Sequence, residues 1–188
     1  GDNRFCFIAP MYNAGVTLPD MLHSIFGQSY DNWHIILIDD VSQKEHIEVE
    51  KRYISLFEKM HPNKLTVIWN NEKKWEVANV LHGLMHCDDN DIVCRIDADD
   101  ALCDLDALMI MNSVYKQTNC DAAWSMHRWG FSDRCISDKL PEGVDVYEYP
   151  WVTSHLKTFR KKLINDVPYE NFTNMNGDLV KRCGDQAI

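Results

Sequence analysis

The sequence predicts an α/β fold with a mostly parallel sheet flanked by helices. Three observations support this prediction: short apolar runs rich in β-branched residues recur along the chain, helical patterns lie between them, and polar residues follow the first four runs. The runs recur about every thirty residues, which is the length of one strand–helix–strand unit. Their nearly continuous apolar character is typical of strands buried on both faces, as in a parallel sheet.

The order of these segments defines the expected elements. Strands are expected over residues 4–9, 33–38, 65–69, 91–96 and 121–126. Helices with an apolar stripe on one face are expected over residues 17–28, 44–60, 75–87 and 104–115. Thr17 is a candidate N-cap, and helical spacing resumes over residues 154–165. The alternation of strands and helices favours right-handed crossovers between parallel strands.

Length and charge limit what the protein can be. The 188 residues, 45% of them hydrophobic, fit one globular domain over residues 1–188. Lysine and arginine number 19 against 29 aspartates and glutamates, so the net charge of −10 disfavours nucleic acid and anionic lipid as partners. Because there is no apolar run of about eighteen residues and no signal-peptide pattern, we expect no membrane span.

The cysteines point to the redox compartment. There are seven of them, an odd number, and no C-x-x-C pair is present. We therefore expect a reduced, cytoplasmic protein rather than a disulfide framework. The chain stops without a helix cap or a polar tail, and we expect it to be a fragment of a longer protein.

Polar residues gather where the first four strands end. In open α/β sheets, ligands bind beyond the carboxyl ends of the strands, so these residues predict one shared site. Singly, each group could be an ordinary turn, where Asn and Asp are common. The residues that follow the four strands are, in order, Pro10, Tyr12 and Asn13; Asp39 and Asp40; residues 70–74; and Asp97, Asp99 and Asp100.

The cluster at residues 97–100 indicates a divalent cation. Three carboxylates within four residues repel one another unless a cation or a proton lies between them. Mg²⁺ and Mn²⁺ favour carboxylate oxygens and keep water or substrate phosphates as further ligands. The alternative interpretation is a solvated loop in which Asp99 or Asp100 caps a helix that begins near Asp104.

Four segments carry a recognisable pattern in a fixed order. Residues 7–14 read FIAPMYNA, 24–32 read SIFGQSYDN, 36–42 read ILIDDVS and 96–100 read IDADD. Together they resemble the family 2 glycosyltransferases, whose metal-binding D-x-D motif the last segment matches. The resemblance covers residues 5 to about 115.

That resemblance implies a GT-A fold, a Rossmann-like sheet that binds a nucleoside-diphosphate sugar, most often a UDP-sugar. It implies inverting transfer of the sugar to an acceptor hydroxyl, with Mn²⁺ or Mg²⁺ as the metal. It also divides the single domain into a nucleotide-binding half, about residues 1–115, and an acceptor-side half, about residues 116–188, truncated at the C-terminus.

The resemblance also carries roles to individual residues. Asp39 would accept a hydrogen bond from the uracil ring nitrogen, Asp97 would approach the ribose or the sugar, and Asp99, with Asp97, would hold the metal on the diphosphate. Asp100 would assist as a further contact. The residues expected to bind the sugar nucleotide are Pro10, Tyr12, Asn13, Asp39, Asp40, Lys74, Asp97 and Ala98.

The C-terminal segment and the stretch after the third strand complete the expectations. Asp185 is the expected general base, and Asp178 is the second candidate; a helix cap is the alternative role for Asp185. The stretch 70–79 departs from the family pattern, because Lys73 and Lys74 replace its glycine region. The phosphate or uracil contact that the resemblance implies there is therefore either missing or supplied by a lysine. A C-terminal histidine ligand is not expected within this chain.

Two other functions remain open from the sequence. A metal-dependent phosphatase or nucleotidyltransferase also uses aspartates after a strand, but the phosphatase type needs a nucleophilic aspartate after the first strand, where this chain has Pro10 and Tyr12. The other alternative is a non-catalytic module that binds a sugar nucleotide or serves as a docking domain in a larger protein.

Overall fold

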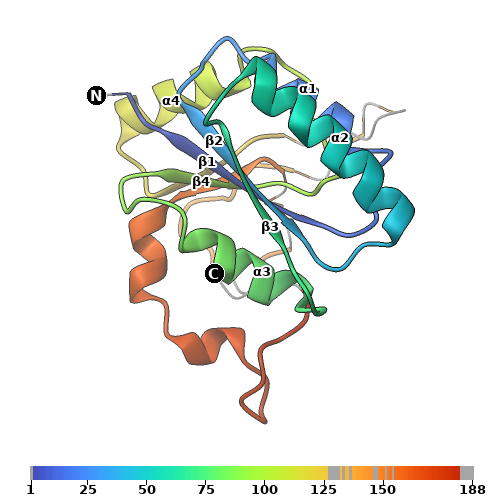
Figure 1. Cartoon of the computed structure of the whole chain (residues 1–188). Coiled ribbons are helices and arrows are strands. Elements are labelled where there is room, and N and C mark those ends of the chain that lie inside the picture. The colour runs from blue at the N-terminus through green and yellow to red at the C-terminus, as the bar shows by residue number, and fades with distance from the viewer. Residues whose placement is uncertain are drawn as a thin grey trace.

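The computed structural model describes residues 2–126, 132, 134–135, 137–145, 148–150, 152–153 and 155–182. Its strands form one sheet in the order β3-β2-β1-β4-β6-β5 (Figure 1). The strands are β1 (Phe5–Met11), β2 (Trp33–Asp39), β3 (Leu65–Trp69), β4 (Ile92–Arg95), β5 (Ala122–Trp124) and β6 (Lys157–Arg160). The helices are α1 (Leu18–Phe26), α2 (Lys44–Met60), α3 (Trp75–Leu84) and α4 (Ala107–Thr118), followed by the 3₁₀ turns η1 (Lys161–Asp166) and η2 (Tyr169–Phe172).

The first four strands are parallel, as the sequence predicts. β1 lies at the centre, paired in parallel with β2 on one side and β4 on the other, and β2 pairs in parallel with β3. The five predicted strands and the four predicted helices that separate them are confirmed, with ends that differ by a few residues. Thr17 does occupy the N-cap position of α1, although its side chain makes no capping hydrogen bond there.

Alternate residues of β1 enter two separate cores, one on each face of the sheet. Phe5 and Phe7 point to the face covered by α1, α2 and α4, whereas Cys6 and Ile8 point to the face covered by α3 (Figure 1). All four side chains are fully buried. This arrangement explains the continuous apolar character of the strand, because each face must bury its own set of side chains.

Helix α3 packs against β1 at a glycine. A Cβ atom placed on Gly83 would lie 2.7 Å from Cγ2 of Ile8 and 3.1 Å from Cδ1 of Ile38. The absence of a side chain at Gly83 therefore lets the helix lie directly on β1 and β2. This close packing fixes the position of α3 and of the loop that precedes it.

The predicted helix over residues 154–165 is wrong. Lys157–Arg160 instead forms β6, which pairs antiparallel with both β4 and β5, and only residues 161–166 are helical, as the turn η1. Buried Thr158 exchanges a hydrogen bond of 2.8 Å with the hydroxyl of Tyr115 on α4 and donates one of 2.7 Å to the carbonyl of Ala123. Pairing with two strands thus overrides the local helical spacing.

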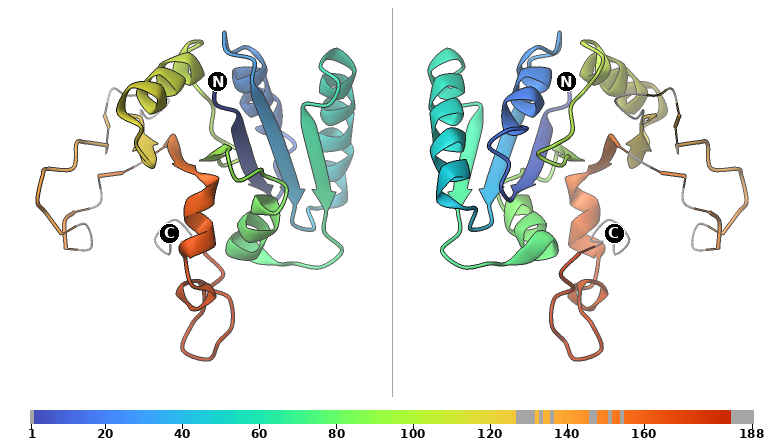
Figure 2. Two further views of the ribbon diagram at one scale, coloured as in Figure 1. Left: turned by 90° about the vertical axis from the view of Figure 1, so that its left-hand side faces the viewer. Right: turned by 90° about the vertical axis from the view of Figure 1, so that its right-hand side faces the viewer.

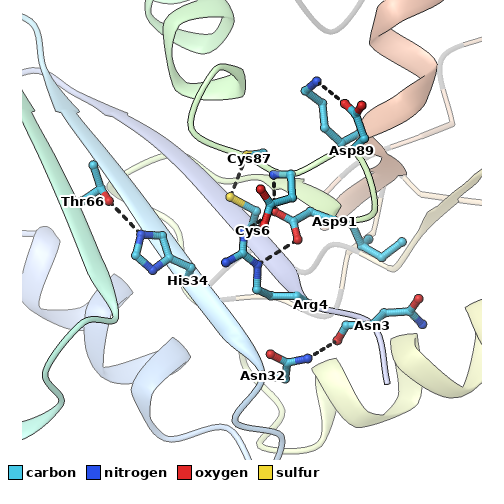
Figure 3. Close-up of polar contacts among 12 residues, drawn as sticks. Asn3, Arg4, Cys6, Asn32, His34, Thr66, Cys87, Asp89 and Asp91 are labelled. Atoms are coloured by element: carbon cyan, nitrogen blue, oxygen red, sulfur yellow. Dashed lines mark hydrogen bonds and ion pairs between the residues drawn. The ribbon is translucent and has the colours of Figure 1, made fainter. Parts of the chain in front are cut away.

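The amino-terminal edge of the sheet is held by an ion pair that Figure 3 shows in close-up. Arg4 binds both carboxylate oxygens of Asp91, at 2.8 and 2.7 Å, and Asp91 is almost fully buried. The Asp91 carboxylate raises the pKa of Arg4 through this hydrogen bond. Beside the pair, the Sγ atoms of the buried Cys6 and Cys87 lie 2.7 Å apart.

Within the described ranges, no helix is both long enough and apolar enough to cross a membrane.

Candidate active site

The loops after β1 and β2 are tied together at the carboxyl edge of the sheet. The amide of Asp40 donates to the carbonyl of Met11 at 2.9 Å, and the amide of Gln43 donates to Oδ1 of Asn13 at 2.8 Å. Asn13 lies in the left-handed region with φ of 54°, which asparagine adopts more readily than most residues. The amide of Asn13 in turn donates to Oγ of Ser42 at 2.8 Å.

Asp39 ends β2 with its carboxylate buried beneath these loops. Its Oδ1 accepts a hydrogen bond of 3.1 Å from the amide of Ser42, and its Oδ2 accepts a short one from the Ser42 hydroxyl. Pro10, half-buried within β1, lies opposite Ile38 in the sheet register. The structure therefore brings the predicted nucleoside residues Pro10, Asn13 and Asp39 to one end of two adjacent strands.

Asp40 holds the loop that leads into α3. Its Oδ1 accepts hydrogen bonds from the amide of Lys74 at 2.7 Å and from the side chain of Asn70 at 3.1 Å, and its Oδ2 accepts one of 2.9 Å from the amide of Trp75. Burial alone would raise the pKa of Asp40, but these hydrogen bonds and one from Asn79 outweigh it and lower that pKa. Asp40 thus supports the loop, and the side chain of Lys74 is left exposed.

Positive charge gathers around two aromatic rings at this edge. The ammonium of Lys73 lies 3.1 Å from the centroid of the half-exposed Tyr12 ring, and Lys73, Lys181 and Arg182 all lie within 6 Å of the centroid of the Trp75 ring. Trp75 has φ of 69°, a backbone strain that costs about 1–3 kcal/mol. In a chain of net charge −10, these cations offer a local binding surface for an anion.

Two of the predicted aspartates meet a histidine beyond the end of β4. Ligand atoms of Asp97, Asp100 and His155 all lie within 4.8 Å of one another, so these residues could hold a metal ion. Among the described residues there is one other such group, formed by Cys6, Cys87 and Asp91. His155 Nε2 lies 3.9 Å from Asp97 Oδ2 and 3.6 Å from Asp100 Oδ2. Asp99 is exposed and outside this group, and Ala98 is buried.

The donor types at this position fit a divalent cation. Carboxylates suit both Mg²⁺ and Mn²⁺, and an added imidazole favours Mn²⁺, which is softer than Mg²⁺. Arg95 at the end of β4 links this group to α3, because its Nη2 lies 3.0 Å from Asp97 Oδ1 and 2.6 Å from Glu76 Oε1. Asp91, by contrast, has both oxygens engaged by Arg4, so we assign no metal to the cysteine pair beside it.

Sequence reasoning missed His155 because its place depends on β6. Lys157 pairs with Arg95 in the antiparallel register, so the residues just before β6 meet the residues just after β4. Lys181 was missed for a similar reason: its carbonyl accepts a hydrogen bond of 3.1 Å from the amide of Glu76, which brings the C-terminal segment to the start of α3. Neither pairing leaves a local signal in the sequence.

Of the two carboxylates predicted to be catalytic, the structure describes one, Asp178. Asp178 is exposed in a turn, where its amide donates to Oδ1 of Asn174 at 3.1 Å and its carbonyl accepts from the amide of Asn174. Figure 2 shows the segment that contains this turn, in orange-red, reaching past the sheet on the side of the arrowheads of β1, β2 and β3. Asp185 lies outside the described residues. Its role as general base stays a prediction.

The comparisons with known proteins identify the class. The sequence model described as glycosyl transferase family 2 matches residues 6–135 of the chain. The chain is 33% identical over 93 residues to the putative glycosyltransferase EpsE of Bacillus subtilis (strain 168), a match that covers 50% of the chain and 32% of EpsE. The chain therefore belongs to glycosyl transferase family 2.

Solved structures share the fold at low sequence identity. The mannosyltransferase PcManGT from Pyrobaculum calidifontis, in complex with GDP-Man and Mn²⁺, aligns with a TM-score of 0.57 at 22% identity over 68% of this chain and 36% of its own. S. aureus TarS 1-349, in complex with UDP, aligns with a TM-score of 0.66 at 16% identity over 87% of this chain and 48% of its own. The GT-A-type α/β fold expected from the sequence is confirmed. The chain spans about a third of EpsE and less than half of either solved chain.

Proposed function

We propose that the chain transfers a sugar from a nucleoside-diphosphate sugar, a UDP-sugar, to an acceptor hydroxyl in a metal-dependent, inverting reaction. The observation that carries this proposal is the grouping of Asp97, Asp100 and His155 at the end of β4, in a member of family 2. β4 neighbours β1, and β1 neighbours β2, so the group shares one sheet edge with the loops of Tyr12 and Asp39. The known relatives include proteins that bind UDP and that bind GDP-Man with Mn²⁺.

Each side of the donor has residues suited to it. Asp39 offers a buried acceptor for a nucleobase N–H, and Tyr12 offers a half-exposed ring at the end of the same edge. The cations Lys73, Lys181 and Arg182 suit the diphosphate, since charge-assisted contacts to phosphate are stronger than neutral ones. The side chain of Lys74 is exposed and stays a candidate for the same role.

The metal would complete the diphosphate site. Asp97, Asp100 and His155 would hold a divalent cation, and that cation would supply positive charge to stabilise the leaving diphosphate. Asp99 remains a candidate ligand from the sequence pattern and lies between the two grouped aspartates. Asp185 is proposed to remove the proton of the acceptor hydroxyl as it attacks the opposite face of the sugar, a role worth about 10²–10⁴-fold in rate.

One set of measurements tests donor, metal and base together. Thermal unfolding with UDP, GDP or TDP is measured with Mn²⁺, with Mg²⁺ or with EDTA, and release of UDP from UDP-sugars is followed in parallel. We expect UDP with Mn²⁺ to stabilise the chain most, by about 3 kcal/mol at a hundred times its Kd. Asp97→Asn should lose the metal-dependent part of this stabilisation. Asp185→Asn should keep it and lose UDP release by about 10²–10⁴-fold.

Controls make the result decisive. Asp20→Asn, an exposed change on α1, should alter neither binding nor turnover. Stabilisation by UDP without any turnover in the wild type would favour the non-catalytic binding module instead. Equal stabilisation by UDP with Mn²⁺ and with EDTA would remove the metal from the proposal.

A further inference from the structure

One buried acid on α2 reaches both nucleoside-side loops. Glu50 is fully buried, and its Oε1 accepts a hydrogen bond of 3.0 Å from the amide of Ala14 in the loop after β1. Its Oε2 is also buried, and among the described residues no donor reaches it. Burying a carboxylate oxygen without a donor is costly, so this atom needs an explanation.

The explanation lies in the neighbouring acid. The neighbouring acid is Asp39 at the end of β2, whose carboxylate acts electrostatically on that of Glu50. Two carboxyl groups can form a hydrogen bond only when one of them carries a proton. Asp39 already accepts two hydrogen bonds from Ser42, whereas no donor among the described residues reaches Oε2 of Glu50, so the proton is assigned to Glu50. Burial first, and then the charge of Asp39, raises the pKa of Glu50 to about 7.

With that proton in place, the hydrogen bonds form a closed ring. The amide of Asn13 donates to the Ser42 hydroxyl, and that hydroxyl donates to Asp39. Glu50 accepts from the amide of Ala14, the residue next to Asn13, and its proton would let it donate to Asp39. The ring therefore joins the loop after β1, the loop after β2 and helix α2.

We propose that Glu50 is a positioning residue for the donor nucleoside, holding Asp39 and the Asn13–Ala14 loop in their binding geometry by donating one hydrogen bond and accepting another. This inference rests on the proposed function, because it concerns the same nucleoside site. Glu50 does not touch the donor itself. It acts through Asp39, whose carboxylate it orients, and through the backbone of Ala14.

Titratable neighbours of Glu50 come from β2 and from its own helix. Asp39 faces it from the end of β2, and His46 precedes it by one turn on α2, with Nδ1 accepting a hydrogen bond of 3.2 Å from the amide of Gly15. The loop after β1 contributes only backbone amides at this position. Loss of the Glu50 proton would therefore set two buried negative charges against each other and loosen the ring.

The test compares Glu50→Gln and Glu50→Ala with the wild type in the affinity for UDP, measured by calorimetry from about pH 6 to about pH 9. Gln can donate to Asp39 and accept from Ala14, and it cannot lose a proton. We expect Glu50→Gln to match the wild type within about twofold near pH 6 and to bind increasingly better than the wild type as the pH rises. Taking the ratio of the two affinities at each pH removes the titration of UDP itself.

Glu50→Ala should weaken UDP binding about tenfold, since it removes the donor to Asp39 and leaves a buried amide unsatisfied. In an Asp39→Asn background the same change should have a smaller effect than in the wild type, because one of the two contacts through which Glu50 acts, the one to Asp39, is already altered. Glu48→Gln and Glu48→Ala are matched controls on the exposed face of α2 and should bind UDP as the wild type does. The melting temperature of each variant is measured as well, to check that the variant is folded.

The possible failures are distinct. A wild-type chain that binds no UDP, with or without Mn²⁺, would overturn the proposed function and this inference with it. A wild type that binds UDP, with Glu50→Ala within twofold of it, would overturn the inference alone. So would a ratio of wild-type to Glu50→Gln affinity that does not change with pH, or additive effects of Glu50→Ala and Asp39→Asn.

Discussion

At the scale of single residues, the two adjacent aspartates at the end of β2 have different roles. Asp39 faces the loop of Ser42 and belongs to the proposed nucleoside site, whereas both oxygens of Asp40 bind the backbone and side chains of the stretch before α3. The sequence places both residues at the site, because a strand end followed by two carboxylates looks the same for either role. Only the hydrogen bonds distinguish a ligand-facing acid from one that supports a loop.

Asp40→Ala should lower the free energy of unfolding by about 1–3 kcal/mol, because the amides of Lys74 and Trp75 lose their acceptor. The pKa of Asp40 is lowered in the folded protein, so its stabilising contribution is complete above the usual pKa of Asp, about 4, and is lost as the pH falls through the lowered pKa. Denaturant unfolding at neutral pH and below about pH 4 measures this effect.

The exposed Glu72 in the same stretch supplies the comparison, and Glu72→Ala should leave stability within about 0.5 kcal/mol of the wild type. A loss of stability for Asp40→Ala that persisted unchanged in acid would contradict the charge-dependent part of the argument.

The site residues that could be predicted from the sequence are those whose place follows from a strand end. Asp97 and Asp100 follow β4 directly, and Asn13 and Asp39 follow β1 and β2, so the parallel order brings them to one edge. His155 could not be found this way, since it comes near Asp97 only through antiparallel pairing. Glu50 lies within a helix and gives no local signal of its contact with Ala14.

At the scale of elements, the packing of α3 on β1 depends on Gly83. Gly83→Ala should destabilise the protein by about 1–3 kcal/mol, because the new methyl group would lie 2.7 Å from Cγ2 of Ile8. The direction of the change in stability distinguishes the two cases. An alanine that meets no obstacle within a helix is more stable than glycine by about 0.5–1 kcal/mol, so a loss of stability would indicate a steric clash. Thermal or denaturant unfolding measures the difference.

A second substitution tests whether the contact with Ile8 is responsible. In an Ile8→Ala background, the additional cost of Gly83→Ala should fall, because the space next to the helix has been opened. Equal costs in both backgrounds would show that Ile8 is not the group that excludes a side chain at Gly83.

The elements that were predicted correctly share one property, which is that local sequence and tertiary environment agree. β1 and β2 are apolar on both faces and are covered on both faces. β6 is the exception: Lys157 and Arg160 flank Thr158 and Phe159, a mixture with helical spacing that becomes a strand only because β4 and β5 pair with it. Long-range pairing of this kind leaves little trace in a short window of sequence.

At the scale of the whole molecule, the C-terminal part is built into the sheet. β6 and β5 extend the sheet beyond β4, so the expected nucleotide-binding half and the expected acceptor-side half share one sheet, and the division between them stays a prediction. A chain that ends at residue 126 should fail to unfold cooperatively, because β4 then has an unpaired edge and Tyr115 loses its partner Thr158. Circular dichroism during heating and size-exclusion chromatography measure this.

A chain that ends at residue 182 is the appropriate comparison, since it keeps every described strand. It should melt in a single transition like the chain of 188 residues. A fragment of residues 1–126 that also melted in one sharp transition would show that β6 is dispensable for the fold.

The insertion of β6 has a consequence for the order of events during synthesis. His155 emerges from the ribosome long after Asp97 and Asp100, together with the strand that completes the sheet. A nascent chain that already presents the loops of Tyr12 and Asp39 therefore still lacks one member of the proposed cation site. The proposed cation site would thus be completed only when β6 has paired with β4, which makes it a late product of folding.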